Sequence, residues 1–320
     1  MSYKLLKCYE NCYKKILFTV GIFNNFLLLL ILDKVLSNTD KDLDKRKIVD
    51  FENNEISHFF KVEKEVILKQ KKWGLRYATC NGKNQSPIDL NFTVPVNPNL
   101  KNLKFSFYDK MPKIVTLTNT GYTVSFKAKW NEKIPIVSGG PLKDVYVFEK
   151  GHFHWGKNDK KGSEHTIECK RYPLELHLVH YKRGYGSVKE AVNYKDGLVV
   201  IGIIFQITNQ NNSRATTFIR RLKKLVNSRK TSVNVRKFNL ESFGLNTNSE
   251  FLLYKGSLTT PPCSEIVTWI ISKQLSTINS MEMNLFREIG LTKGRKSNFR
   301  SLQWTNKRKV YSLQAIAENV

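Results

Sequence analysis

Short runs of alternating apolar and polar residues dominate the chain from residue 73 onward. A period of two is typical of a strand with one buried face, and Phe105–Tyr108, Val115–Thr118 and Tyr122–Phe126 follow it. Gly197–Phe205 and Val267–Ile271 are almost continuously apolar, which is typical of strands that are buried on both faces. These runs predict an extended sheet.

Helical periodicity is confined to two segments. Phe218, Leu222 and Leu225 recur at intervals of three and four residues, and Met281–Ile289 forms a second helical pattern that ends before Gly290. Many strands and few helices predict a β-dominated α+β fold, with residues 73–320 as a single domain. We expect a large, central, twisted and mostly antiparallel mixed sheet with a few short peripheral helices.

The first 72 residues have a different character. Lysines in residues 1–15 precede an apolar segment at 16–32, which is the order of a secretory signal peptide or a signal-anchor. The segment is close to the lower length limit for a membrane span. Residues 1–36 could therefore be a signal peptide that is cleaved off or a signal-anchor that is retained in the membrane. We interpret the charged residues 37–72 as a linker or stalk. The domain would then be secreted or anchored on the lumenal or extracellular side.

The formal net charge of +26 raises the question of a nucleic-acid partner. The basic residues are dispersed along the chain, and no nucleic-acid-binding motif accompanies them, so we expect no such partner. A hydrophobic content of 41% is sufficient for a packed core and argues against an intrinsically disordered chain.

Five of the six histidines lie between His152 and His180. Alternate residues of a strand share a face, so His152 and His154 project together, as do Glu175 and His177. If the two strands are neighbours, three imidazoles meet. Three neutral imidazoles suit Zn²⁺ and leave a fourth position for water, as in a catalytic zinc site. Glu175 could accept a hydrogen bond from the other nitrogen of His177.

A single histidine is more often a hydrogen-bonded core residue than a metal ligand. We expect this of His165 and His180. His180 lies three residues after His177 and therefore on the opposite face of the strand.

Five blocks of sequence around these histidines resemble the α-class carbonic anhydrases. They are Asn81–Leu90, Phe153–Gly156, Gly162–Thr166, Glu175–His180 and Gly256–Pro262. The resemblance extends from about Trp73 to Arg308. It implies reversible, zinc-dependent hydration of CO₂ to bicarbonate and a proton, by attack of zinc-bound hydroxide on CO₂ in an apolar pocket.

The resemblance also implies roles for individual residues. His152, His154 and His177 would bind Zn²⁺, while Thr259 would accept a hydrogen bond from the hydroxide and donate one to Glu164. Glu175 and Asn298 would support the ligands. The pocket for CO₂ would be formed by Val179, Val200, Leu258, Thr260, Val267 and Trp269.

Three positions depart from the family pattern. Tyr122 stands where fast members carry a histidine that shuttles protons, and a phenol with a pKa near 10 is a poor relay at neutral pH. Lys150 replaces a glutamine that supports the first ligand, and because an ammonium cannot accept a hydrogen bond, His152 needs another acceptor. Gly151 replaces a bulky apolar residue. Because Tyr122 replaces the shuttle histidine, we expect slow proton transfer.

The competing hypothesis is a catalytically weak or silent relative that acts as a binding module. Such relatives typically lack zinc histidines, and all three are present here, which favours the enzyme. The resemblance further implies a disulfide between Cys80 and Cys263, as in extracellular members, which agrees with the secretory N-terminus.

Overall fold

The computed structural model describes residues 70, 72–210, 215–226, 232–235 and 238–318. The apolar segment 16–32 and nearly all of the charged segment 37–72 lie outside these residues. Within the described residues, no helix is both long and apolar enough to span a membrane. Residues from Trp73 onward form one compact unit.

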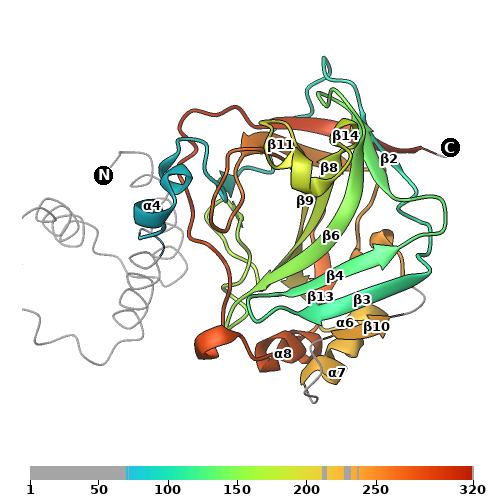
Figure 1. Ribbon diagram of the computed structural model, residues 1–320, viewed down its shortest axis with the longest axis vertical. Helices are drawn as coiled ribbons and strands as arrows, with labels where there is room; N and C mark the ends of the chain where they lie inside the picture. Colours follow the sequence, from blue (N-terminus) through green and yellow to red (C-terminus); the bar gives the residue numbers. More distant parts are fainter. Residues whose placement is uncertain (1–69, 71, 211–214, 227–231, 236–237, 319–320) are drawn as a thin grey trace, which may run out of the picture. The chain divides into compact units, whose positions relative to one another are not determined.

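Strands dominate this unit (Figure 1). They are β1 (Asp89–Leu90), β2 (Leu103–Ser106), β3 (Ile114–Asn119), β4 (Val124–Lys129), β5 (Ile136–Gly139), β6 (Tyr146–Trp155), β7 (Thr166–Ile167), β8 (Leu174–Lys182), β9 (Leu198–Ile207), β10 (Ser232–Val235), β11 (Glu250–Gly256), β12 (Val267–Ser272), β13 (Ser276–Ile278) and β14 (Tyr311–Glu318).

The helices are short. The α-helices are α4 (Trp73–Arg76), α5 (Val188–Ala191), α6 (Thr216–Ile219), α7 (Lys223–Val226) and α8 (Ser280–Glu288). Single turns of 3₁₀-helix are η1 (Ala78–Asn81), η2 (Arg183–Tyr185), η3 (Arg220–Leu222), η4 (Leu240–Phe243) and η5 (Thr292–Gly294).

A 12-stranded sheet runs in the order β10-β3-β4-β6-β5-β2-β14-β11-β12-β9-β13, and β8 pairs with both β6 and β9. Three of its pairings are parallel, namely β12 with β9, β13 with β9 and β14 with β2, and the other pairings are antiparallel. The predicted β-dominated fold with a mostly antiparallel mixed sheet is therefore confirmed. Strand β8 is buried along nearly its whole length and pairs with a neighbouring strand along each edge.

The helical pattern around Phe218 differs from the single helix that the sequence predicts. It is divided into α6, η3 and α7, although Phe218, Leu222 and Leu225 are all buried as expected. Like charges three and four residues apart destabilise a helix, and the four cations Arg220, Arg221, Lys223 and Lys224 have this spacing. Periodicity therefore identified the buried face but not the continuity of the helix.

The strand predicted at Tyr122–Phe126 also starts later than expected, at Val124. Gly121 has a φ of 76° and the backbone of Tyr122 belongs to the turn before β4. Positive φ favours glycine, so Gly121 fixes the turn that presents Tyr122.

His180 is a core histidine. It is fully buried, its Nδ1 donates to the Leu178 carbonyl at 3.0 Å, and its Nε2 lies 2.6 Å from the Tyr108 hydroxyl. Burial lowers the pKa of His180 to about 3. The imidazole is therefore neutral in the folded protein at pH values where an unfolded histidine is charged.

This difference predicts a pH dependence of stability. Between the ordinary pKa of 6.5 and about 3, the unfolded His180 binds a proton that the folded one does not, so stability falls as pH falls. The loss is about 1.4 kcal/mol per pH unit. In His180→Gln this dependence is absent, and the slope of unfolding free energy against pH should be smaller by about one proton. Urea unfolding of the metal-free proteins across this window tests it, and equal slopes would contradict it.

Candidate active site

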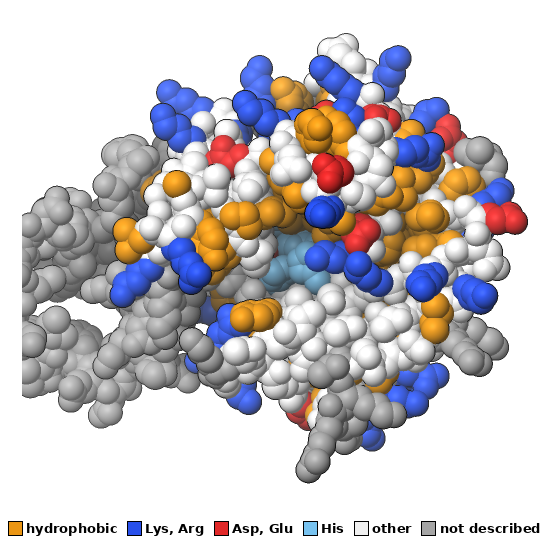
Figure 2. All heavy atoms as spheres, viewed as in Figure 1, with side chains coloured by type: hydrophobic (Ala, Val, Ile, Leu, Met, Phe, Trp, Pro, Cys, Tyr) orange, Lys and Arg blue, Asp and Glu red, His pale blue; other side chains and the backbone are white. Residues whose placement is uncertain are grey.

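The predicted ligand histidines converge on two adjacent strands. Strands β6 and β8 are antiparallel, with His152 opposite His177 and His154 opposite Glu175. The ring centroids of the three imidazoles are 4.6 to 5.1 Å apart, and one nitrogen of each lies within 4.8 Å of the others. Figure 2 shows histidine side chains in a hollow of the visible surface. The space between the three imidazoles could hold a metal ion.

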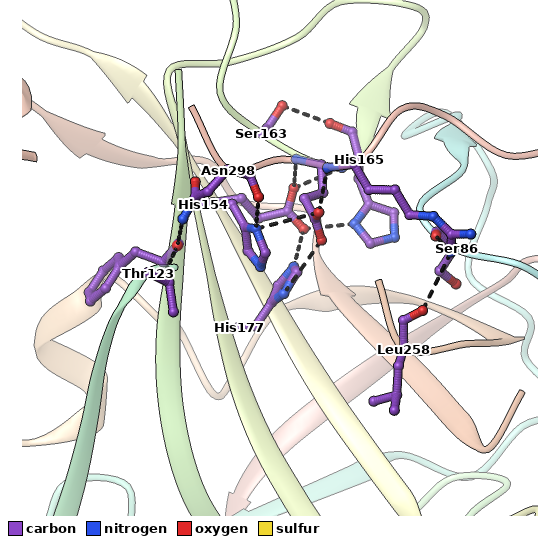
Figure 3. A network of polar contacts seen from close by, with 12 residues as sticks. Ser86, Thr123, His154, Ser163, His165, His177, Leu258 and Asn298 are labelled. Carbon is purple, nitrogen blue, oxygen red and sulfur yellow. Dashed lines mark hydrogen bonds and ion pairs between the residues drawn. The ribbon is translucent and has the colours of Figure 1, made fainter. Parts of the chain in front are cut away.

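Hydrogen bonds select the nitrogens that face the centre of this group (Figure 3). His177 donates from Nε2 to Glu175 at 2.7 Å, which leaves Nδ1 for a ligand. His154 donates from Nδ1 to the Asn298 carbonyl at 3.1 Å, and its Nε2 is buried without a hydrogen-bond partner. A buried polar nitrogen without a partner is typical of a site for an ion or water. The donor set fits Zn²⁺, which three imidazoles bind with one position left open.

Glu175 holds two histidines at once. Its Oε1 accepts hydrogen bonds from His177 and from His165 Nδ1, each at 2.7 Å, and its Oε2 accepts from the backbone amides of Glu164 and His165, each at 2.8 Å. Burial alone would raise the pKa of Glu175, but the two histidines lower it well below its ordinary value. The carboxylate is therefore charged and fixes the orientation of His177.

His165 is buried, as expected, and also takes part in the site. Its Nε2 lies 2.6 Å from the hydroxyl of Tyr254, which donates to Ser86 at 2.9 Å. Tyr254 and Ser86 were not among the predicted site residues. Ser86 lies in one of the family-like blocks, whereas no sequence pattern distinguishes Tyr254.

Two of the predicted ligand histidines, His152 and His154, are neutral in the folded protein. Burial is the largest cause that lowers the pKa of both His152 and His154, and neighbouring histidines lower these pKa values further. A neutral imidazole keeps the lone pair that a metal requires. At neutral pH these two histidines are therefore ready to bind a cation without first losing protons.

Glu164 lies between the ligands and a buried arginine. Its Oε1 accepts the backbone amide of Arg300 at 2.7 Å and lies 3.4 Å from His154 Nδ1. Its Oε2 is buried without a hydrogen-bond partner, so the hydrogen bond from Thr259 that the resemblance implies is not formed in this structure. Arg300 was not predicted, and its guanidinium donates to the Ser86 carbonyl at 2.8 Å.

An apolar wall borders the histidines. Val179 lies opposite Val200, and Val200 lies beside Trp269 in the parallel pairing of β9 and β12. The Trp269 ring is 4.7 Å from the His177 ring, and Val267 and Leu258 belong to the same apolar cluster. Thr260, by contrast, is exposed. The predicted pocket residues are thus brought together, with Thr260 on the solvent side.

His152 has no hydrogen-bond acceptor to support its ring. Its Nδ1 is buried and has no hydrogen-bond partner, so the expectation that another residue replaces the missing glutamine is not met. Lys150 lies on the same side of β6, opposite Val179, after a bulge between Phe148 and Lys150. A Cβ at Gly151 would overlap the Phe126 ring, so Phe126 fills the space that a larger residue would take there.

This missing acceptor gives a testable prediction. In Lys150→Gln the amide oxygen can accept from His152 Nδ1, and zinc should then bind about 10- to 100-fold more tightly, the usual effect of an outer hydrogen-bond partner. The rate of zinc loss to a chelator measures this. Lys150→Met is the matched control, because it removes the same charge without adding a carbonyl. Equal gains in both variants would show that charge, and not the acceptor, limits affinity.

Tyr122 lies at the edge of the site and is 64% exposed. Its carbonyl accepts from the Asn298 side chain at 3.2 Å, and the Arg295 guanidinium lies 5.3 Å from the centre of its ring. Asn298 therefore connects the Tyr122 turn to His154.

Cys80 and Cys263 form a disulfide. Gln85 donates to the Cys263 carbonyl at 3.1 Å, and the Asn84 amide donates to Glu265 at 2.6 Å. These contacts attach the loop after Thr259 to residues 80–85. Disulfides are typical of proteins that fold in an oxidising compartment.

Known proteins share this sequence pattern. A family model described as eukaryotic-type carbonic anhydrase matches residues 68–314. Carbonic anhydrase 7 of Mus musculus is 35% identical over 224 residues, which cover 69% of this chain and 82% of the relative. The human protein of the same name is 34% identical over 224 residues, with the same coverage of each chain. Putative carbonic anhydrase 3 of Caenorhabditis elegans is 37% identical over 238 residues, 73% of this chain and 92% of the relative.

The matched region contains the three predicted ligand histidines, Glu164 and the Thr259 loop. It also contains most of the sheet that positions them. The chain therefore belongs to the eukaryotic-type, α-class carbonic anhydrases and is an enzyme of that family.

Proposed function

We propose that this carbonic anhydrase hydrates CO₂ with a zinc ion held by His152, His154 and His177. The observation that carries the proposal is the convergence of three imidazoles beside an apolar wall, with Nε2 of His154 buried and without a hydrogen-bond partner. When bound, zinc supplies a nucleophile at neutral pH, because it lowers the pKa of a coordinated water to about 7, a value already known for carbonic anhydrases.

The chain's own residues supply the rest. Val179, Val200 and Trp269 provide a dry surface for CO₂, which is linear and uncharged and gains nothing from a charged pocket. Glu175 keeps His177 oriented through its hydrogen bond. Thr259 and Glu164 are both buried, and Oε2 of Glu164 has no hydrogen-bond partner, so it is available to accept from the Thr259 hydroxyl. Their role is to orient the nucleophile.

Proton release is slow in this proposal. Tyr122 is exposed at the edge of the site and is a poor relay at neutral pH, because a phenol holds its proton too tightly. Turnover then depends on buffer molecules that carry the proton away.

The enzyme acts in the secretory pathway, either secreted or anchored through residues 16–32. The disulfide supports this location, since disulfides persist in oxidising compartments.

Zinc content and CO₂ hydration of the purified protein test the proposal together. We expect one zinc per chain and a hydration rate that falls with zinc removal and returns when zinc is restored. A folded protein that takes up no zinc and hydrates no CO₂ would instead support a silent relative that acts as a binding module.

A further inference from the structure

Lys150 has no role in the reaction proposed above, yet it lies on the ligand side of β6. It precedes His152 by two residues and lies opposite Val179, and regular pairing continues from it to His154. Alternate strand residues share a face, so Lys150, His152 and His154 form one row. Lys150 is exposed, His152 is half-buried and His154 is buried. The row therefore leads from solvent to the metal site.

The nearby carboxylates are already engaged. Glu149, the residue just before Lys150, forms an ion pair with Lys127 at 2.9 Å. Glu175 is held by two histidines and two backbone amides. In the described part of the chain, no carboxylate forms an ion pair with Lys150. Its positive charge is thus uncompensated at the edge of the site.

The surface view agrees with this arrangement. Figure 2 shows Lys and Arg side chains along the edge of the hollow in which the histidines are visible.

We propose that Lys150 is a specificity-determining residue that attracts small monovalent anions, bicarbonate among them, to the zinc site. The inference rests on the proposed function. CO₂ is neutral and gains nothing from the ammonium, whereas bicarbonate and anionic inhibitors are attracted by it. The enzyme should therefore bind its anionic product and monovalent anions more tightly than a neutral residue at this position would allow.

The expected size follows from the spacing. Alternate strand residues are roughly 7 Å apart. Unit charges at about this distance, with an effective dielectric constant between roughly 20 and 80, change an affinity by about threefold to fiftyfold.

The experiment compares Lys150→Met and Lys150→Arg with wild type, using azide and bicarbonate as probes. Inhibition of CO₂ hydration gives one set of constants. Visible absorption of the Co²⁺-loaded protein during azide titration gives dissociation constants that do not depend on activity. We expect Lys150→Met to weaken binding about threefold to fiftyfold and Lys150→Arg to stay within about twofold of wild type. Added salt should reduce the difference, because it screens exposed charges.

Lys101→Met is the matched control for loss of one positive charge. Lys101 is exposed and precedes β2, which β5 separates from β6. We expect wild-type anion affinities for this variant. An equal shift in Lys101→Met, or no shift in Lys150→Met, would overturn the inference.

The two proposals fail in different ways. If wild type hydrates CO₂ but Lys150→Met binds azide as tightly as wild type does, the proposed function stands and the inference is refuted. A wild type that is inactive with zinc but, when loaded with Co²⁺, binds azide with the expected Lys150 dependence refutes the function and supports anion attraction. A folded protein that takes up neither metal refutes both.

Discussion

Replacing His177 with alanine is expected to remove the bound zinc and to abolish CO₂ hydration. In the proposed site His177 offers Nδ1 to the metal while Glu175 holds Nε2 at 2.7 Å, so the substitution removes a ligand that is already oriented. Loss of an outer hydrogen-bond partner alone costs about 10- to 100-fold in metal affinity, and loss of the ligand should exceed this. Without the metal, no nucleophile is available at neutral pH.

The measurement combines zinc content per folded chain with stopped-flow CO₂ hydration. His180→Gln is the matched control, because it removes a histidine from the same strand. His180 is fully buried, is hydrogen-bonded to Tyr108 and lies on the face away from the ligands. We expect the control to keep its zinc, although it is less stable. If His177→Ala kept both zinc and activity, the metal site would have to be elsewhere.

Replacing Tyr122 with histidine is expected to accelerate turnover at low buffer concentration. An imidazole with a pKa near 6.5 exchanges protons readily at neutral pH, and a positioned proton relay contributes about 10²- to 10⁴-fold. We expect a gain at the lower end of this range, since Tyr122 is 64% exposed and a side chain there is only loosely held. Wild type should approach the variant's rate when imidazole-type buffer is added.

Turnover measured against buffer concentration tests this expectation. Tyr122→Phe is the control that removes the hydroxyl and keeps the ring beside Arg295. If Tyr122→Phe slowed the enzyme further, the phenol itself would carry protons. A wild type whose fast turnover ignored buffer concentration would also contradict the expectation.

Local periodicity was sufficient to predict much of the fold. Alternation and continuous apolar runs located β3, β9 and β12. A strand that is buried on one face has apolar residues at every second position, and a strand that is buried on both faces is apolar throughout. Helical continuity was less predictable. The segment around Phe218 is divided into α6, η3 and α7, and its exposed cations have spacings that destabilise a helix, which the spacing of buried residues does not report.

The candidate site was also predictable from the sequence only in part. The spacing of His152 and His154, and of Glu175 and His177, determined which side chains share a face, because strand geometry is local. The match of five blocks to one family then indicated the chemistry. Neither argument could place the two strands in register, and it is the β6–β8 pairing that puts His152 opposite His177.

Contacts over long sequence separations were decided only by the tertiary structure. Asn298 and Arg300 reach His154 and Glu164 from more than 130 residues away. Phe126 fills the space beside Gly151 from a neighbouring strand. The sequence alone predicted the strand-rich fold and the candidate ligand set, and it identified the unusual residues at 122 and 150. Only the folded chain showed that His152 Nδ1 has no acceptor, because a hydrogen bond depends on which distant atoms the sheet brings within reach.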